Sequence, residues 1–157
     1  MSDGPPQVFN RRVKRIQRDA AASRQDRDQY TLLRHDIAER LVDRLEDTLR
    51  VFPVAAEIGC ADGALLRCLQ GRGGVKRLLQ CDSSQKMLDL CESGSVGGVE
   101  ALTLLADEEA LPLATASQDL ILSNLALHWV NDVPGPLSLC VCVCVCVCVS
   151  VLHAACV

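Results

Sequence analysis

The feature of this sequence that most constrains its fold is a regular alternation of short apolar runs with amphipathic segments in the middle of the chain. Four apolar runs are predicted to form buried strands: Val54–Ile58, Val75–Cys81, Ala101–Leu105 and Leu120–Ser123. The segments that join the first three runs are long enough for helices of about ten residues. Strand–helix–strand crossovers in one sheet are right-handed and return the chain parallel to its first strand. The alternation therefore predicts an α/β domain with a parallel sheet.

The chain before the first strand is predicted to be helical. Between Tyr30 and Leu49, apolar residues recur every three or four positions, which indicates an amphipathic helix that Pro53 is expected to stop. Residues 1–28 form a basic segment that is expected to be a solvated helix, since its acidic residues disfavour a transit peptide. The cations of this segment are Arg11, Arg12, Lys14, Arg15 and Arg18. The formal net charge is only -4, so no nucleic-acid partner is expected.

Acidic residues stand at the ends of the first two predicted strands. The string Glu57-Ile58-Gly59-Cys60-Ala61-Asp62-Gly63 closes the first strand, and Asp82 lies nineteen residues after Gly63. Ligands of α/β sheets bind at the carboxyl ends of strands, where small residues admit a ligand and a carboxylate accepts hydrogen bonds from a ribose diol. A nicotinamide site is the competing interpretation, but the spacing here differs from G-x-G-x-x-G. A tight strand-to-helix turn without a ligand is the other alternative.

These residues resemble the class I, S-adenosylmethionine-dependent methyltransferase superfamily. By that resemblance, Glu57, Gly59, Cys60, Ala61 and Gly63 form the cofactor loop. Asp82 matches the acid that binds the ribose, and Asp107 matches the acid near the adenine amino group, with a helix N-cap as its alternative role. Ala61 departs from the usual middle glycine. The resemblance implies S-adenosylmethionine as cofactor and an incomplete Rossmann-like domain with its four strands in the order 3-2-1-4.

A closer resemblance is to a family of mitochondrial complex I assembly factors described as peptidyl-arginine hydroxylases. It is carried by residues 8–11 (VFNR), 106–112 (ADEEALP) and 123–132 (SNLALHWVND). It implies a location on the matrix side of the inner mitochondrial membrane and a complex I subunit or assembly intermediate as partner. Bacterial malonyl-carrier-protein O-methyltransferases share a similar last stretch and are the alternative. The third alternative is that the chain is a non-catalytic or truncated product.

The residues themselves do not point to the chemistry of hydroxylation. The histidines are His35, His128 and His153, and none has the close carboxylate partner of a two-His, one-carboxylate iron site. His128 and Asp132 are helically spaced, but a third ligand is missing, so no metal is expected. Trp129 is expected to pack at a rim or core rather than to cover a ligand. No catalytic residue is assigned.

The last part of the chain changes character. From Val133 to Val157 there is no charged residue, and Cys140–Val149 alternates cysteine with valine. Three interpretations remain: a membrane span, a strand, or a translated TG repeat, which is favoured. We expect a methyltransferase-type domain over 29–136, truncated near Pro136 and inactive, followed by a non-native tail over 137–157. Any membrane contact is expected through that tail alone. The fourth strand would then lie at an open edge.

Overall fold

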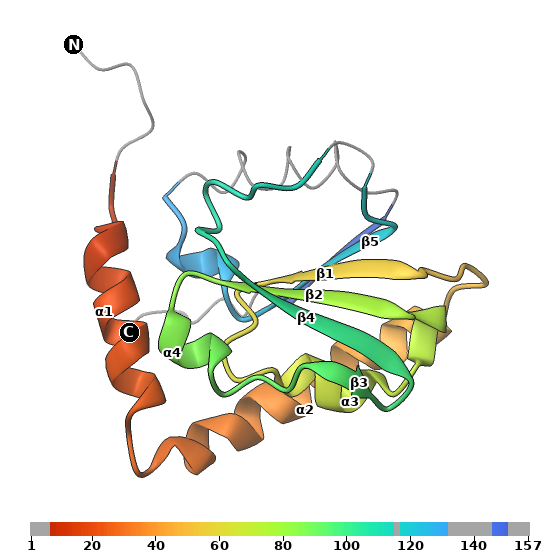
Figure 1. Cartoon of the computed structure of the whole chain (residues 1–157), viewed down its shortest axis with the longest axis horizontal. Helices are drawn as coiled ribbons and strands as arrows, with labels where there is room; N and C mark the ends of the chain where they lie inside the picture. The colour runs from red at the N-terminus through yellow and green to blue at the C-terminus, as the bar shows by residue number, and fades with distance from the viewer. Residues whose placement is uncertain (1–6, 115–116, 132–145, 151–157) are drawn as a thin grey trace.

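A six-stranded mixed sheet forms the centre of the computed structural model, which describes residues 7–114, 117–131 and 146–150 (Figure 1). Its strands are β1 (Val54–Ile58), β2 (Arg77–Asp82), β3 (Gly94–Val96), β4 (Val99–Leu105), β5 (Leu120–Asn124) and β6 (Cys146–Ser150). Their order is β3-β4-β2-β1-β5-β6, and only the β3–β4 pair is antiparallel. The predicted α/β fold is confirmed, because β4-β2-β1-β5 is the expected order 3-2-1-4.

The two outer strands correct the sequence-based expectation. None of the four predicted strands includes Gly94–Val96, but β3 and β4 form a hairpin across Gly97 and Gly98, whose φ angles of 55° and 83° suit its two-residue turn. The open edge expected beside Leu120–Ser123 is also wrong. There β6 pairs in parallel with β5, because an alternating segment rich in β-branched valine suits a strand. Residues 132–145, which join the two, lie outside the described ranges.

The helices lie on one face of the sheet and across one end of it (Figure 1). They are α1 (Arg11–Ala22), α2 (Arg27–Glu46), α3 (Ala64–Leu69) and α4 (Gln85–Leu88), with the 3-10 turns η1 (Arg72–Gly74) and η2 (Leu127–Trp129). The predicted stop of α2 at Pro53 is wrong. The helix ends at Glu46, because the Thr48 hydroxyl accepts a hydrogen bond from the Arg50 amide and forms a turn there. Among the described residues, no helix has the length and apolar character needed to cross a membrane.

Two clusters of buried apolar residues pack on the two faces of the sheet. On the first face, Leu41 and Leu45 of α2 and Leu65 of α3 pack against buried strand residues such as Leu78. On the second face, residues that follow β4 and β5 cover the strands, including Leu111, Leu127 and Val130. Each fully buried leucine contributes about 1.5–3 kcal/mol. β1 is therefore buried on both faces, and it holds the loop that follows it in a fixed position.

Residues 1–28 were expected to form a helix that lies free in solvent. Helix α1 instead packs against the rest of the protein. It stands at the carboxyl end of the parallel strands, beside α4 (Figure 1). The Asn10 side chain accepts a hydrogen bond from the Val13 amide and so caps the helix. Only Ala22 of the helix is buried, whereas Val13 and Ile16 are about half exposed. The helix is therefore held by its charged side chains, which reach into the candidate site.

Candidate functional site

The loop between β1 and α3 needs its two glycines. Gly59 has a φ of 71°, and a Cβ atom there would lie 2.2 Å from the Cβ of Ala126. Gly63 also has a φ of 71°, and its Cβ would lie 2.9 Å from Oε1 of Gln80 and 3.3 Å from Sγ of Cys91. Any larger residue would clash at both positions and would adopt a strained backbone. Both glycines therefore serve the tight turn. Gly59 also lines the first of the two cavities described below.

Ala61 stands where the related loops have their middle glycine. Its φ is 51°, in the left-handed region, which costs a non-glycine residue about 1–2 kcal/mol. The conformation aims the Ala61 amide at Asp82, and the N–H donates to Oδ2 at 3.0 Å. Leu125, after β5, also has a positive φ, and both residues line the same cavity. Backbone strain of this kind concentrates at functional sites.

Asp82, the last residue of β2, is an acid of the site that backbone amides hold in place. Its side chain is fully buried. Besides the bond from Ala61, its Oδ1 atom accepts hydrogen bonds from the Ser84 amide at 2.9 Å and from Nη1 of Arg18 at 3.0 Å. The two backbone donors fix the carboxylate at the end of the strand, as the sequence predicted. The third donor comes from α1, and the sequence did not predict it.

Glu57 lies within β1, beneath the loop, and lines neither of the cavities described below. Its side chain is buried, and Oε2 has no hydrogen-bond partner among the described residues. Burial raises the pKa of the Glu57 carboxyl well above its ordinary value, and the nearby Cys91, Asp62 and Asp82 raise it further. The site therefore holds a carboxyl group whose charged form is poorly satisfied.

Cys60 is a buried thiol and not an activated nucleophile. Its Sγ atom lies 3.8 Å from Sγ of Cys91, and both thiols are free. The contact with Cys91, and then burial, raise the pKa of Cys60 well above its ordinary value. The thiolate is the reactive form of cysteine, so this environment makes Cys60 inert. Its role is that of a small residue in a crowded turn.

The acids after β4 meet the arginines of α1. Asp107 accepts hydrogen bonds from Nη2 of Arg11 at 2.7 Å and from the Glu109 amide at 2.9 Å. Burial alone would raise the pKa of Asp107, but these hydrogen bonds lower it below its ordinary value. No helix begins here, so the N-cap alternative is wrong. The neighbouring Glu108 is almost fully buried and contacts both Arg11 and Arg18, although its place in an acidic run gave no sign of this.

Two cavities open at this end of the sheet. The first, of about 200 Å³, is lined by Arg18 together with Gly59, Ala61, Met87 and Asn124, among others. The second, of about 370 Å³, is lined by Arg11, Arg12, Arg15, Ser83, Leu105, Ala106 and Asp107. Arg18 lines the first cavity, and its Nη1 atom also lies 3.3 Å from Oγ of Ser83, which lines the second, so its guanidinium lies between the two. Asp82 lies at the same point, since it binds that guanidinium.

Polar groups of β5 and η2 complete the first cavity. Asn124 is largely buried, and its Oδ1 atom has no partner among the described residues. Trp129 lies at the rim of the first cavity with Nζ of Lys14 3.5 Å from its ring centroid, and its expected packing role stays a prediction. Burial, with the charges of Arg18 and Lys14, lowers the pKa of His128. The Asp132 of the considered His128–Asp132 pair lies outside the described residues, and among those described no group of acids, histidines and cysteines is arranged to hold a metal.

Comparison with known sequences identifies a family. A family model described as "Methyltransferase domain" matches residues 56–144. The Danio rerio protein named "Arginine-hydroxylase NDUFAF5, mitochondrial" is 38% identical over 130 residues, which are 83% of this chain and 39% of the relative. The Homo sapiens protein of that name is 33% identical over 83% of this chain and 36% of its own length. A malonyl-[acyl-carrier protein] O-methyltransferase of Halorhodospira halophila is 33% identical over 87% and 46%, respectively.

Solved structures agree on the fold. A Haloferax volcanii methyltransferase in complex with the Trm112 activator superposes with a TM-score of 0.64 at 22% identity, over 81% of this chain and 55% of that chain. The plantazolicin methyltransferase BpumL in complex with SAH gives a TM-score of 0.56 at 18% identity, over 80% and 52%. The chain spans less than half the length of the curated relatives described above. Since the family model covers more than half of its residues, the chain belongs to the methyltransferase domain family.

Proposed function

We propose that this chain binds S-adenosylmethionine and that it is a methyltransferase-like protein of mitochondrial respiratory complex I assembly. The similarity to the proteins named arginine-hydroxylase NDUFAF5, mitochondrial, supports this assignment. On that basis its partner is a complex I subunit or assembly intermediate, and its location is the matrix side of the inner mitochondrial membrane. The proposed cofactor-binding residues are Glu57, Gly59, Cys60, Ala61, Gly63, Asp82 and Asp107, of which Glu57, Cys60 and Gly63 act by shaping the loop rather than by lining a cavity.

The observation that carries the proposal is the position of Asp82. Its carboxylate is buried at the carboxyl end of a central parallel strand and is fixed there by the amides of Ala61 and Ser84. A carboxylate offers about four acceptor positions, so Asp82 can accept two ribose hydroxyls at the position that Arg18 occupies. The cavities on either side have room for the two ends of an extended nucleoside ligand.

One unpartnered oxygen atom fits a ligand that donates hydrogen bonds. Oδ1 of Asn124, a residue that lines the first cavity, has no partner among the described residues. A cationic ligand would relieve the excess of acidic groups around Asp82. S-adenosylmethionine has hydroxyl, ammonium and sulfonium groups of this kind, and when bound it supplies an electrophilic methyl group. The protein's own residues orient it and exclude water.

Asp107 and the residues next to it suit the other end of the ligand. Asp107 lines the second cavity together with Leu105 and Ala106, which offer apolar surface for a flat ring. A carboxylate beside such a surface accepts a hydrogen bond from an exocyclic amino group. We therefore place the adenine in the second cavity and the methionine part of the cofactor in the first.

Calorimetric titration with S-adenosylhomocysteine and with NAD tests the assignment. We expect the homocysteine compound to bind and NAD not to bind. Asp82→Asn should weaken binding by about 1.5–3 kcal/mol, because the ribose loses its charged acceptor. Asp36→Asn, which removes an exposed carboxylate on α2, is the matched control and should bind as the wild type does. Thermal melts of each variant check folding. Binding of NAD alone would overturn the proposal.

The malonyl-carrier-protein O-methyltransferases are a second candidate, because the Halorhodospira halophila relative matches 87% of this chain. The two candidates differ in the acceptor, so acceptor assays separate them. The full chain is incubated with methyl-labelled S-adenosylmethionine and either malonyl-acyl-carrier protein or an arginine-containing peptide. Label on the acyl-carrier protein would favour the second candidate. Mass spectrometry of the peptide distinguishes methylation from hydroxylation.

A further inference from the structure

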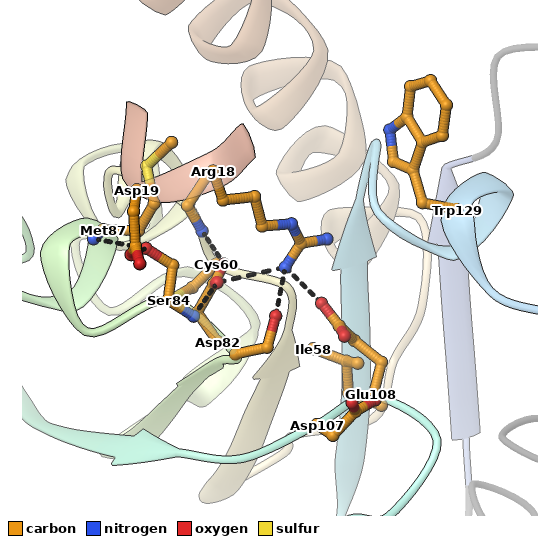
Figure 2. Close-up of polar contacts among 12 residues, drawn as sticks. Arg18, Asp19, Ile58, Cys60, Asp82, Ser84, Met87, Asp107, Glu108 and Trp129 are labelled. Carbon is orange, nitrogen blue, oxygen red and sulfur yellow. Dashed lines mark hydrogen bonds and ion pairs between the residues drawn. The ribbon is translucent and has the colours of Figure 1, made fainter. Parts of the chain in front are cut away.

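Helix α1 places an arginine on the acid that is proposed to bind the cofactor ribose. Nη1 of Arg18 donates to Asp82 at 3.0 Å and also contacts Glu108, and its side chain is only 17% exposed (Figure 2). Burial alone would lower the pKa of Arg18, but the charges of Asp82 and Glu108 raise it. The guanidinium is therefore firmly charged and takes one of the acceptor positions of Asp82 that a ribose diol would use.

A second arginine of the same helix covers the other proposed cofactor acid. Arg11 lies three turns before the end of α1 and binds Asp107 through two nitrogen atoms, Nε at 3.1 Å and Nη2 at 2.7 Å. It also contacts Glu108, which thus joins the two arginines. In the free protein, α1 therefore supplies positive charge to the buried acids Asp82 and Glu108 and to the partly exposed Asp107.

The attachment of α1 is polar rather than apolar. The Ser84 hydroxyl donates to Asp19, Nζ of Lys86 lies 3.2 Å from the Ser23 hydroxyl, and Lys14 stacks on Trp129. Only Ala22 of the helix is buried. Hydrogen bonds to charged groups such as these contribute about 1.5–3 kcal/mol each, but water and a charged ligand can replace them when the helix moves, whereas neither replaces apolar contacts with a core. Elements with few buried apolar contacts open at a low free-energy cost.

We propose that α1 is a displaceable strap, in which Arg18 occupies the ribose position of Asp82 and must leave when the cofactor binds. The proposal rests on the proposed function, because it takes the cofactor site to be the one built around Asp82. When an internal group competes for the site, the apparent affinity equals the intrinsic affinity multiplied by the fraction of molecules in which the site is free. The strap thus keeps the acids neutralised in the free protein and makes helix displacement part of binding.

Removal of the competing guanidinium should strengthen binding. We expect Arg18→Gln to lower the Kd for S-adenosylhomocysteine about tenfold, because the strapped state no longer competes. Arg40→Gln is the matched control, since it removes the same charge from an exposed position on α2 and should leave the Kd unchanged. Asp19→Ala weakens the strap at Ser84 without removing a cation from the acids, so it should also strengthen binding. It serves as a second variant if Arg18→Gln does not fold.

Movement of the strap can be followed in the wild-type chain. The sequence has one tryptophan, Trp129, and Lys14 of α1 lies against its ring, so displacement of α1 should change its fluorescence. Amide hydrogen exchange of residues 11–22 should become faster when S-adenosylhomocysteine is added. Slower exchange, or equal affinity of Arg18→Gln, Asp19→Ala and the wild type, would overturn the strap. If no variant binds the compound at all, the proposed function fails as well.

Discussion

At the scale of single residues, the acids of the site differ in how the fold satisfies them. Asp82 accepts hydrogen bonds from two backbone amides and an arginine. Glu57 is also buried, yet one of its oxygen atoms has no partner among the described residues. Burying an unpaired carboxylate is far more costly than burying a carboxylic acid. Glu57 should therefore make stability depend on pH.

The direction of that dependence follows from proton linkage. The folded-state pKa of Glu57 is raised above 4.5, so folding takes up a proton between the unfolded and the folded pKa. The contribution of Glu57 to stability is therefore complete below pH 4.5 and declines as pH rises through the folded pKa. We expect Glu57→Gln to remove part of this decline. Urea unfolding of the variant and the wild type from pH 5 to pH 8 measures it.

A matched substitution keeps this prediction specific. Glu100→Gln removes an exposed carboxylate from β4 and should leave the pH dependence as it is in the wild type. If Glu57→Gln shows the same decline as the wild type, the buried carboxyl is satisfied by a partner. The loop would then differ from the arrangement described here.

At the scale of elements, the segment before α1 is fastened to the loop after η2 by one side chain. Oδ1 of Asn131 accepts a hydrogen bond from the Phe9 amide at 2.6 Å, and its Nδ2 donates to the Phe9 carbonyl at 3.0 Å. Nδ2 also donates to Glu109. The Phe9 ring meets Trp129 edge to face, with 5.7 Å between the ring centroids. This contact sets where α1 begins.

Asn131→Ala should release that segment. The loss of its two side-chain hydrogen bonds to Phe9 is expected to cost about 1–2 kcal/mol, measured by urea unfolding. Hydrogen exchange of residues 11–22 should also become faster, because α1 loses its N-terminal anchor. Asn131→Asp keeps the acceptor for the Phe9 amide but places a carboxylate against Glu109 and the Phe9 carbonyl, so it should destabilise the protein at least as much as Asn131→Ala. Equal stability of all three proteins would contradict the role of Asn131.

At the scale of the whole molecule, β6 decides where the sheet ends. It runs parallel to β5, with Leu120 opposite Cys146 and Asn124 opposite Ser150. All five residues of β5 are buried, and two of its carboxyl-terminal neighbours, Leu125 and Ala126, line the first cavity. An unpaired edge at β5 would leave backbone groups without partners next to the site. The Cys-Val segment therefore contributes backbone pairing to the sheet.

Proline substitution tests this pairing. Successive amides of an edge strand point in opposite directions, so only one of Val147 and Cys148 donates to β5. We expect one of Val147→Pro and Cys148→Pro to lower stability by about 1–3 kcal/mol and the other to have a smaller effect. Each variant is thus the control for the other in a thermal melt. Unchanged melting of both would show that β6 adds nothing to stability.

The sequence by itself determined the central sheet and the position of the acids at the strand ends. Apolar runs, glycines and strand-end acids are local signals, and parallel strands bring their carboxyl ends to one edge. Asp82 could thus be placed at the site, although its neighbour Glu57 proved to lie beneath the cavities. The end of α2 could not be predicted, because a turn at Thr48 stops it before the apolar period ends.

Only the tertiary structure decided what meets the acids. Arg18 is 64 residues from Asp82 and 90 from Glu108 in the chain, and no periodicity links positions so far apart. A basic helix with few apolar contacts is equally compatible with solvent and with an acidic cleft, and the complementary charges at the strand ends select the cleft. The partner of β6 was likewise undecided, because an alternating pattern specifies a strand but not the edge it joins.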